Sequence, residues 1–336
     1  MKIAIYGAGS LGTILGAYIS KAGFDVDLIT RNKQHVNGMN KIGAQIIGMV
    51  DMVVPVNALT PDAMTEKYDV IFLMTKQLDN KNILNNLKKY MSDECVICTT
   101  QNGIPELLVS EVMGEEKTIG CTVGWGATLK GNGVSELTSE VETLNFGLGR
   151  INGQVDKKLL EVKKILETMC HVHVEKNFMG MRWAKLMINA TFSGMSAVTG
   201  GTFGEAVDHM ESRRCCHEIF KECVDVAHAS NIIIEKVEGK DIVKFFYYKK
   251  KGLWQKISFK LLPIGINKHK LLKASMLQDL EKERKSEVDA INGVVCAFGR
   301  KYGIATPFND KVCEIIHGIE DGKYSCSFDN VKMFFS

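Results

Sequence analysis

The first half of the chain alternates short apolar runs with amphipathic stretches, and the second half loses the short runs. Residues 2–6, 25–30, 69–74 and 95–100 are rich in apolar and β-branched side chains and predict β-strands, with helices between several of them. Strands that alternate with helices are typical of a parallel sheet in an α/β domain.

More strands are expected at residues 118–123, 134–137, 143–148 and 171–174. Residues 154–169 have the periodicity of a helix, and helical patterns dominate beyond residue 177. The expected fold is therefore α/β, with a Rossmann-type dinucleotide-binding domain over residues 1–176 and an all-helical domain over residues 177–336.

Length and composition agree with a soluble globular protein. The chain has 336 residues, of which 45% are hydrophobic and 24% charged, and no segment approaches the ~18 consecutive apolar residues of a membrane helix. Ten cysteines without a secretion signal fit a reducing compartment, so a cytoplasmic location is expected. A net charge of +3 gives no reason to expect a nucleic-acid or membrane partner and leaves room for small anionic ligands.

A glycine motif directly follows the first predicted strand and opens a helical segment. Its sequence is Gly7-Ala8-Gly9-Ser10-Leu11-Gly12. In a dinucleotide fingerprint the first glycine permits a tight turn, the second lets a pyrophosphate approach the backbone, and the third lets helix and strand pack closely. The helix N-terminus would offer free N–H groups to the phosphates. These six residues are the predicted cofactor-binding loop.

The end of the second strand indicates which dinucleotide is preferred. NAD sites usually place a carboxylate there, but this chain has Arg31, followed by Asn32 and Lys33. Asp25 and Asp27 lie earlier and alternate with apolar residues, which places them on a face of the strand. Arg31 is suited to a 2′-phosphate, so NADP is the predicted cofactor; an ordinary solvated loop arginine is the alternative.

Two later loops and one helix carry further candidates. Lys76 and Asn102 follow the third and fourth strands, at the sheet edge where open α/β folds bind ligands. Lys185, Asn189 and Ser193 are spaced four apart in an otherwise apolar stretch and share one helical face. Because a lysine and an amide in such a stretch need partners, this face is predicted to line a cleft or a polar network.

Taken together, these motifs resemble the ketopantoate reductase (2-dehydropantoate 2-reductase) family over nearly the whole chain. The matching motifs are the glycine loop, Lys76, Asn102-Gly103, Lys185-Leu186-x-x-Asn189, and Ser275-Met276-Leu277-Gln278-Asp279 leading to Glu287 and Asn292-Gly293. The resemblance implies a Rossmann domain followed by a helical domain, with the active site in the cleft between them. It also implies NADPH-dependent reduction of 2-dehydropantoate to pantoate, a step of pantothenate and coenzyme A synthesis.

The resemblance assigns roles residue by residue. Lys185 matches the catalytic lysine, which would polarise the 2-oxo group and donate a proton, and Glu287 matches the active-site glutamate. Asn102 and Asn189 match amides near the nicotinamide and substrate, with Ser193 one turn further on, and Ser275 matches the serine that binds the substrate carboxylate. Arg31 and Lys76 match cofactor-binding positions.

Three departures from the family pattern leave the substrate open. Ser193 and Gln101 stand where many members have asparagine and histidine, and the stretch between Asn231 and Ser275 is longer than usual by about twenty residues on informal comparison. A reductase of another branched 2-oxo acid is the nearest alternative. A nucleotide-binding sensor without turnover is the alternative from a different class.

The remaining candidates favour structural roles. Cys95 and Cys98 have redox spacing but lie in an apolar strand, and Cys215, Cys216, His217 and Cys223 lack paired ligand spacing, so no metal is predicted. His171 and His173 are expected to be structural. The segment 236–273, here called the lysine-rich segment, has eleven lysines interleaved with aromatics; a solvated helical face is favoured over a binding role. A homodimer is expected.

Overall fold

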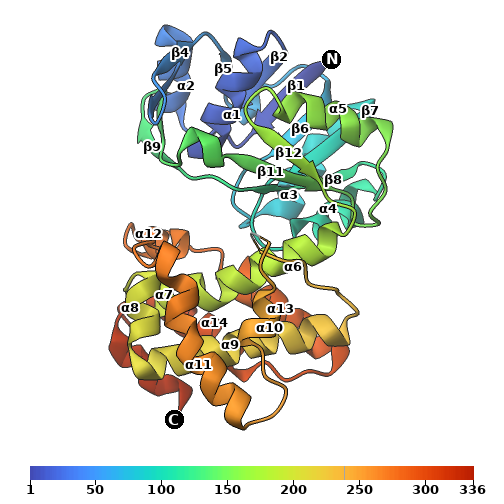
Figure 1. Ribbon diagram of the computed structural model, residues 1–336. Coiled ribbons are helices and arrows are strands. Elements are labelled where there is room, and N and C mark those ends of the chain that lie inside the picture. Colours follow the sequence, from blue (N-terminus) through green and yellow to red (C-terminus); the bar gives the residue numbers. More distant parts are fainter. Residues whose placement is uncertain (238) are drawn as a thin grey trace. The chain divides into compact units, whose positions relative to one another are not determined.

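Seven of the eight strands expected in the first half of the chain form one mixed sheet together with β5 (Asn57–Leu59), which was not expected; the eighth, at residues 134–137, belongs to a second sheet. The strands of the mixed sheet are β1 (Lys2–Tyr6), β2 (Asp25–Ile29), β5, β6 (Tyr68–Leu73), β7 (Met91–Thr99), β8 (Thr118–Val123), β11 (Asn145–Gly149) and β12 (His171–Val174). Their order is β12-β11-β8-β7-β6-β1-β2-β5 (Figure 1). All neighbouring strands are parallel except β8 and β11, which are antiparallel. The sequence predicted a parallel sheet, and this one pair departs from that prediction.

The strand order places a topological switch point between β1 and β6. From β1 the chain moves outward through β2 to β5, then returns to the other side of β1 and continues outward through β6, β7 and β8. Connections on the two sides of β1 therefore diverge, and open α/β sheets bind ligands in the crevice that this leaves at the carboxyl ends of the strands.

A second sheet in this part of the chain was not expected from the sequence. It consists of β3 (Ala44–Gly48), β4 (Met52–Val54), β9 (Ala127–Gly131) and β10 (Val134–Leu137), in the order β4-β3-β10-β9. Of these four strands, only β10 was predicted. The others are short or partly exposed and do not form continuous apolar runs, and β3 finds its parallel partner β10 almost ninety residues later.

Helices cover both faces of the large sheet. They are α1 (Ser10–Lys21), α2 (Lys33–Ile42), α3 (Asn80–Leu87), α4 (Pro105–Met113) and α5 (Lys157–Leu166), with 3₁₀ turns η1 (Pro61–Ala63), η2 (Lys88–Tyr90) and η3 (Val141–Thr143). Side chains of α1, α2 and α5 share one core with the second sheet, whereas α3 and α4 enclose the core on the opposite face. Helix α5 begins three residues later than expected because Asp156 caps it, accepting a hydrogen bond from Leu159 N.

The second half of the chain is helical, as expected. Its elements are α6 (Phe178–Ile188), a π-helical turn η4 (Asn189–Ser193), α7 (Gly194–Thr199), α8 (Phe203–Asp208), α9 (Met210–Ala229), α10 (Ile242–Phe246), α11 (Leu253–Ile266), η5 (Asn267–His269), α12 (Ser275–Leu280), α13 (Val288–Tyr302), α14 (Pro307–Glu320) and η6 (Phe328–Phe334). Trp183 is fully buried in this core, where its indole N–H donates to Cys223 O at 2.9 Å.

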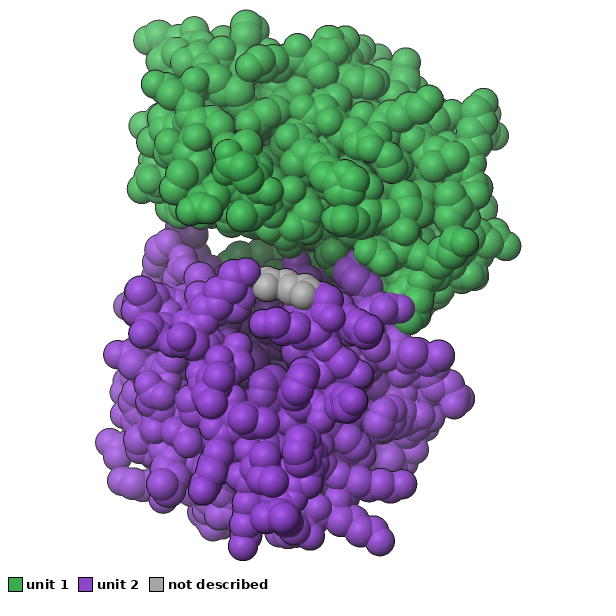
Figure 2. Space-filling view, viewed as in Figure 1, with its two compact units in different colours: residues 1–178 green, residues 179–336 purple. Residues whose placement is uncertain are grey.

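The chain divides into two compact units, unit 1 (Met1–Phe178) and unit 2 (Met179–Ser336), shown in different colours in Figure 2. A computed structural model describes residues 1–237 and 239–336, and residue 238 of the lysine-rich segment lies outside the described residues. The expected boundary, after residue 176, lies two residues before this division. No helix among the described residues is long and apolar enough to cross a membrane.

A fully buried histidine ties the second sheet to the helices beside it. His35 Nδ1 accepts a hydrogen bond from Gly133 N at 2.9 Å, and its Nε2 lies 2.8 Å from Thr13 Oγ1. Because Nδ1 is an acceptor, the ring is neutral and carries its proton on Nε2. Burial lowers the pKa of His35 below 6.5.

We expect His35 to make the folded protein sensitive to acid. The pKa of His35 is lower in the folded protein than in the unfolded chain, so below about pH 6.5 the unfolded chain binds more protons. The contribution of neutral His35 to the free energy of unfolding is therefore fully present above about pH 6.5 and is lost as the pH falls towards the folded pKa. The loss is up to ~1.4 kcal/mol per pH unit. Urea unfolding across this range should show a smaller decline for His35→Gln and an unchanged one for His171→Gln, an exposed histidine. Equal declines in all three proteins would remove His35 as the source.

Candidate active site

The glycine loop lies at the switch point and joins three strand ends. The amides of Gly7 and Ala8 both donate to Ile29 O at 2.9 Å, which ties the loop after β1 to the end of β2. Gly7 has a φ of +114°, and a Cβ there would lie 2.5 Å from Thr75 N, in the loop after β6. Only glycine therefore lets these loops approach so closely.

The other two glycines have contrasting surroundings. A Cβ on Gly12 would lie 2.5 Å from Gly7 O, so glycine is required for α1 to pack against the loop. A Cβ on Gly9 would meet no atom within 4 Å. Gly9 is the N-cap residue of α1 and has no side chain with which to cap it. Open space beside the N-terminus of a twelve-residue helix fits a pyrophosphate group, which the helix N–H groups and dipole would bind.

The carboxyl end of β2 carries a cation and no carboxylate. Arg31 is exposed two residues beyond the end of β2. Burial raises the pKa of Tyr6, at the end of β1, and the positive charge of Arg31 opposes that rise, so the guanidinium lies near the end of β1 as well. Its position agrees with contact to an anionic group bound at this edge.

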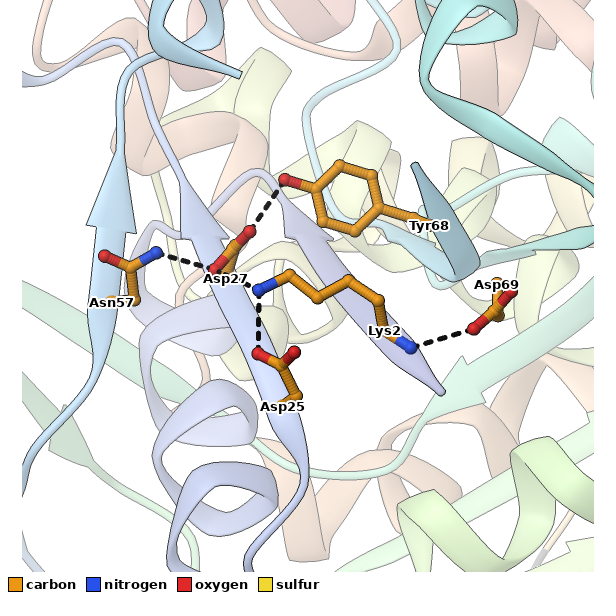
Figure 3. Close-up of polar contacts among 6 residues, drawn as sticks. All are labelled: Lys2, Asp25, Asp27, Asn57, Tyr68 and Asp69. Carbon is orange, nitrogen blue, oxygen red and sulfur yellow. Dashed lines mark hydrogen bonds and ion pairs between the residues drawn. The ribbon is translucent and has the colours of Figure 1, made fainter. Parts of the chain in front are cut away.

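Both acidic residues of β2 are engaged elsewhere (Figure 3). Asp27 is 1% exposed; its Oδ1 accepts from Asn57 at 2.7 Å and Lys2 at 3.1 Å, and its Oδ2 accepts from the Tyr68 hydroxyl at 2.8 Å. Lys2 Nζ also donates to Asp25 at 2.7 Å. Asp27 therefore forms a structural cluster within the sheet, as its place in the middle of the strand predicted, and is not available to a ribose.

An amide pair holds the loops after β6 and β7 together. Gln101 Nε2 donates to Asn80 Oδ1 at 2.8 Å, and Asn80 Nδ2 returns a bond to Gln101 Oε1 at 2.9 Å. Gln101 Nε2 also donates to Thr75 O at 2.7 Å. The neighbouring residues of these two loops are Lys76 and Asn102, so a buried network sets the backbone from which both project. Asn80 was not recognised from the sequence.

The predicted polar face of unit 2 runs along one continuous helical rod. Lys185 lies on α6, Asn189 opens the π turn and Ser193 closes it; the lysine and asparagine are half-buried, and the serine is buried. In an α-helix, side chains four residues apart are rotated by ~40° relative to each other about the helix axis. The wider π turn, with i→i+5 bonds, rotates less per residue and offsets this drift. The π turn therefore keeps the three residues closer to one line than an unbroken α-helix would.

Asn292, on α13, stabilises the π turn. Gly194 N donates to Asn189 O, five residues earlier, instead of to Ala190 O. Ala190 O, which therefore lacks the hydrogen bond from Gly194 N, accepts one from Asn292 Nδ2 at 3.0 Å. Asn292 belongs to one of the sequence motifs, but its role could not be predicted because its partner lies 102 positions away.

A buried chain of hydrogen bonds continues from Asn292 into the core of unit 2. Asn292 Nδ2 also donates to Asn309 Oδ1 at 2.9 Å, and Asn309 Nδ2 donates to Glu222 Oε2 at 2.7 Å. Glu222 further accepts from the backbone N–H groups of Phe308 at 2.8 Å and Asn309 at 2.9 Å, and so caps the N-terminus of α14. Burial raises the pKa of Glu222 to about 7, although these donors favour its charged form.

The last two predicted residues lie on elements that pack against this rod. Ser275 is the exposed first residue of α12, which packs on the π turn and α7. Glu287 is the half-buried N-cap residue of α13, which also packs on the π turn. The expected residues of unit 2 therefore come from the rod and from two helices that each pack on it, and those of unit 1 come from four adjacent strand ends.

The other cysteine and histidine candidates lie in structural surroundings. Cys95 and Cys98 are buried in β7, and burial raises the pKa of the Cys95 thiol to about 12. His217, on α9, contacts Phe246 O and Ser258 Oγ, both at 3.0 Å. The described residues contain no cluster of three or more His, Cys, Asp or Glu side chains arranged to hold a metal ion.

One surface pocket of unit 1 lies away from these residues. It has a volume of about 380 Å³ and is lined by Lys67, Lys88, Met91, Ser92, Asp93, Val112, Met113 and Lys117. Met91 begins β7, so the pocket lies at the amino edge of the sheet, opposite the glycine loop. None of the predicted site residues lines it.

Comparison with known proteins identifies relatives along the chain. The family model described as ketopantoate reductase PanE/ApbA matches residues 3–150, and the corresponding C-terminal model matches residues 177–320. A 2-dehydropantoate 2-reductase of Streptococcus pyogenes serotype M3 is 25% identical over 323 residues, covering 95% of this chain and 98% of the relative.

Solved structures share the fold over both units. A ternary complex of D-mandelate dehydrogenase with NADH and anilino(oxo)acetate has a TM-score of 0.79 at 23% identity, covering 96% of this chain and 99% of the other. A PanE/ApbA family ketopantoate reductase from Ralstonia eutropha has the same TM-score and coverage at 21% identity. A dimeric ketopantoate reductase from Staphylococcus aureus has a TM-score of 0.73 at 17% identity, covering 96% and 100%.

Proposed function

Because the chain belongs to the ketopantoate reductase family, we propose that it reduces 2-dehydropantoate to pantoate with NADPH, in pantothenate and coenzyme A synthesis. The observation that carries this proposal is that the two family models match in order, the first over residues 3–150 of unit 1 and the second over residues 177–320, two residues of which belong to unit 1 and the rest to unit 2. Unit 1 is the proposed cofactor domain, and unit 2 supplies the catalytic lysine.

The cofactor side is built from the strand ends at the switch point. The glycine loop and the N-terminus of α1 bind the pyrophosphate, and Arg31 pairs with the 2′-phosphate that distinguishes NADPH from NADH. Lys76 binds a further cofactor group, and Asn102 accepts or donates a hydrogen bond near the nicotinamide. NADPH, when bound, supplies the hydride that reduces the 2-oxo carbon.

The substrate side is built from unit 2. The Lys185 ammonium polarises the 2-oxo group and gives a proton from Nζ to the oxygen as it becomes an alkoxide. Glu287 orients the substrate and the lysine. Asn189 and Ser193 donate hydrogen bonds to the substrate from the same face of the rod, and Ser275 binds the substrate carboxylate.

The direct test is oxidation of NADPH followed at its absorbance band, with 2-dehydropantoate beside NADH and a panel of branched 2-oxo acids. Selective turnover of 2-dehydropantoate with NADPH is the expected result. Binding of NADPH without turnover of any 2-oxo acid would contradict the proposal and favour a nucleotide sensor.

A different 2-oxo acid is the second candidate. The serine at position 193 is buried and is shorter than the asparagine of many family members, which fits a substrate of a different shape. The fold is also shared with a D-mandelate dehydrogenase. Preferred turnover of 2-oxo-2-phenylacetate or another branched acid over 2-dehydropantoate would favour this candidate while retaining the same chemistry.

We expect Gly9→Val to weaken NADPH binding without reducing stability. Its side chain would enter the open space beside α1, so the affinity should fall about tenfold or more while the unfolding midpoint stays near that of the wild type. Calorimetric titration with NADPH measures the first and urea unfolding the second. Gly12→Val is the matched control: it collides with Gly7 O and should lower stability. Unchanged affinity in Gly9→Val would place the pyrophosphate elsewhere.

We expect Arg31→Ala to lower the preference for NADPH. Loss of a charge-assisted contact to the 2′-phosphate should raise KM for NADPH about tenfold and leave KM for NADH nearly unchanged. Lys41→Ala, which removes an exposed cation from the far end of α2, is the control. An equal effect on both cofactors would argue against contact between Arg31 and the 2′-phosphate.

A cytoplasmic homodimer completes the proposal. The ten cysteines, all among the described residues, form no disulfide, which fits a reducing compartment, and one structural relative is dimeric. Light scattering of the purified protein measures its oligomeric state, and a monomer at working concentration would contradict the second part.

A further inference from the structure

Helix α11 is anchored to unit 2 by one apolar face. Ser258, Leu262 and Ile266 are buried on that face, which packs on α8, α9 and α10. Phe246 of α10 contacts α11 so closely at Gly265 that a Cβ there would lie 2.3 Å from its ring. The helix is therefore fixed in place, and its opposite face points outward (Figure 1).

The outward face of α11 carries several exposed apolar side chains. Leu253, Ile257 and Ile264 are 76%, 39% and 71% exposed, and they follow one another at helical spacings of four and seven residues. Trp254, beside them, is 44% exposed, and its indole N–H donates to Tyr247 O at 2.9 Å. Lys256 and Lys260 lie on the same side of the helix and are exposed, so the outward face is mixed apolar and basic, as in a helix that lies at a membrane surface.

The charge around this face is strongly one-sided. Residues 242–273 contain nine lysines and no aspartate or glutamate, so the rest of the chain carries an excess of six acidic side chains. The whole-chain value of +3 conceals this separation. Lys249, Lys250 and Lys251 directly precede α11 and are exposed, although cations at a helix N-terminus oppose its dipole. Helix stability does not account for their position.

The nearest acidic residues of α9 are engaged by the aromatic side chains. Tyr248 OH donates to Glu218 at 2.6 Å, and Tyr247 OH donates to Asp225 at 2.8 Å. Asp225 also pairs with Lys221. The aromatics of the lysine-rich segment thus partly pack inward, as expected, but Trp254 and Phe245, 47% exposed, remain at the surface.

We propose that the outward face of α11 docks onto an anionic membrane surface, with Leu253, Trp254, Ile257 and Ile264 entering the interfacial region and the flanking lysines contacting lipid headgroups. Exposed aliphatic and Trp side chains flanked by lysines are the features of an interfacial helix. A second copy of the chain would bring two equally basic faces together and repel. A nucleic acid would pair with the lysines but leave the aliphatic side chains exposed. The docking does not depend on the reductase activity.

The test is co-sedimentation of the full chain with vesicles of phosphatidylcholine, with and without phosphatidylserine. We expect binding only to the anionic vesicles, weakening as salt is raised. The triple variant K249E/K250E/K251E should lower the partition coefficient on the order of a hundredfold, because each of the three lysines near the membrane surface contributes about equally to the electrostatic attraction. I257S/I264S should weaken binding without removing its salt dependence.

A matched control separates this face from general electrostatic attraction. K41E/K81E/K157E changes the net charge equally at exposed lysines of unit 1 and should bind anionic vesicles as the wild type does. Turnover of the 2-oxo acid should stay unchanged in all three variants. Absence of binding to anionic vesicles would overturn the proposal, also if the chain instead binds an acidic protein. An equal loss of vesicle binding in K41E/K81E/K157E and in K249E/K250E/K251E would overturn it as well.

Discussion

Replacing Lys185 by methionine should lower kcat by about 10²–10⁴-fold, the usual contribution of a positioned proton donor. Methionine keeps much of the length and apolar stem of lysine but removes the ammonium that polarises the 2-oxo group and protonates the alkoxide. The affinity for NADPH should stay within about twofold, because the proposed cofactor contacts lie in unit 1. Steady-state kinetics and calorimetric titration with NADPH measure the two quantities.

Two variants sharpen this experiment. Lys185→Arg keeps the positive charge but scarcely releases a proton, because the pKa of arginine lies above ~12, so it separates polarisation from proton transfer. Lys221→Met removes another partly buried lysine of unit 2, paired with Asp225 on the surface of α9, and should change kcat less than about twofold. Near-normal turnover in Lys185→Met would remove Lys185 from the mechanism.

Removing the Glu222 side chain should cost about 3–5 kcal/mol of folding free energy, a large part of the ~5–15 kcal/mol typical of a domain. Glu222→Ala leaves the backbone N–H groups of Phe308 and Asn309 and the side chain of Asn309 without their acceptor, in a largely buried part of unit 2. Urea unfolding followed by circular dichroism measures the change.

Two comparisons identify the cause of that loss. Glu222→Gln keeps the shape and one acceptor oxygen and should be intermediate. Glu314→Ala, also a glutamate in unit 2, breaks only an exposed pair with Lys311 one turn away and should cost less than about 0.5 kcal/mol. If Glu222→Ala were no more harmful than Glu314→Ala, the buried chain to Asn292 would not stabilise the fold.

Local pattern was sufficient for much of unit 1. Strands β1, β8, β10 and β12 have the predicted bounds, and the glycine loop follows β1 as its spacing requires. Each of these signals lies within about ten residues of sequence, because strand alternation and a helix start are local properties. The spacing of Lys185, Asn189 and Ser193 is local in the same sense.

Tertiary structure decided how these local pieces are used. The π turn depends on Asn292 reaching Ala190 O across 102 positions, and Glu222 reaches the start of α14 across 87. His35 likewise depends on Gly133, 98 positions away. A polar residue carries no local sign of so distant a partner, since only burial makes the hydrogen bond necessary. The sequence therefore determines where strands and the nucleotide loop form, whereas long-range packing determines which polar side chains shape the site.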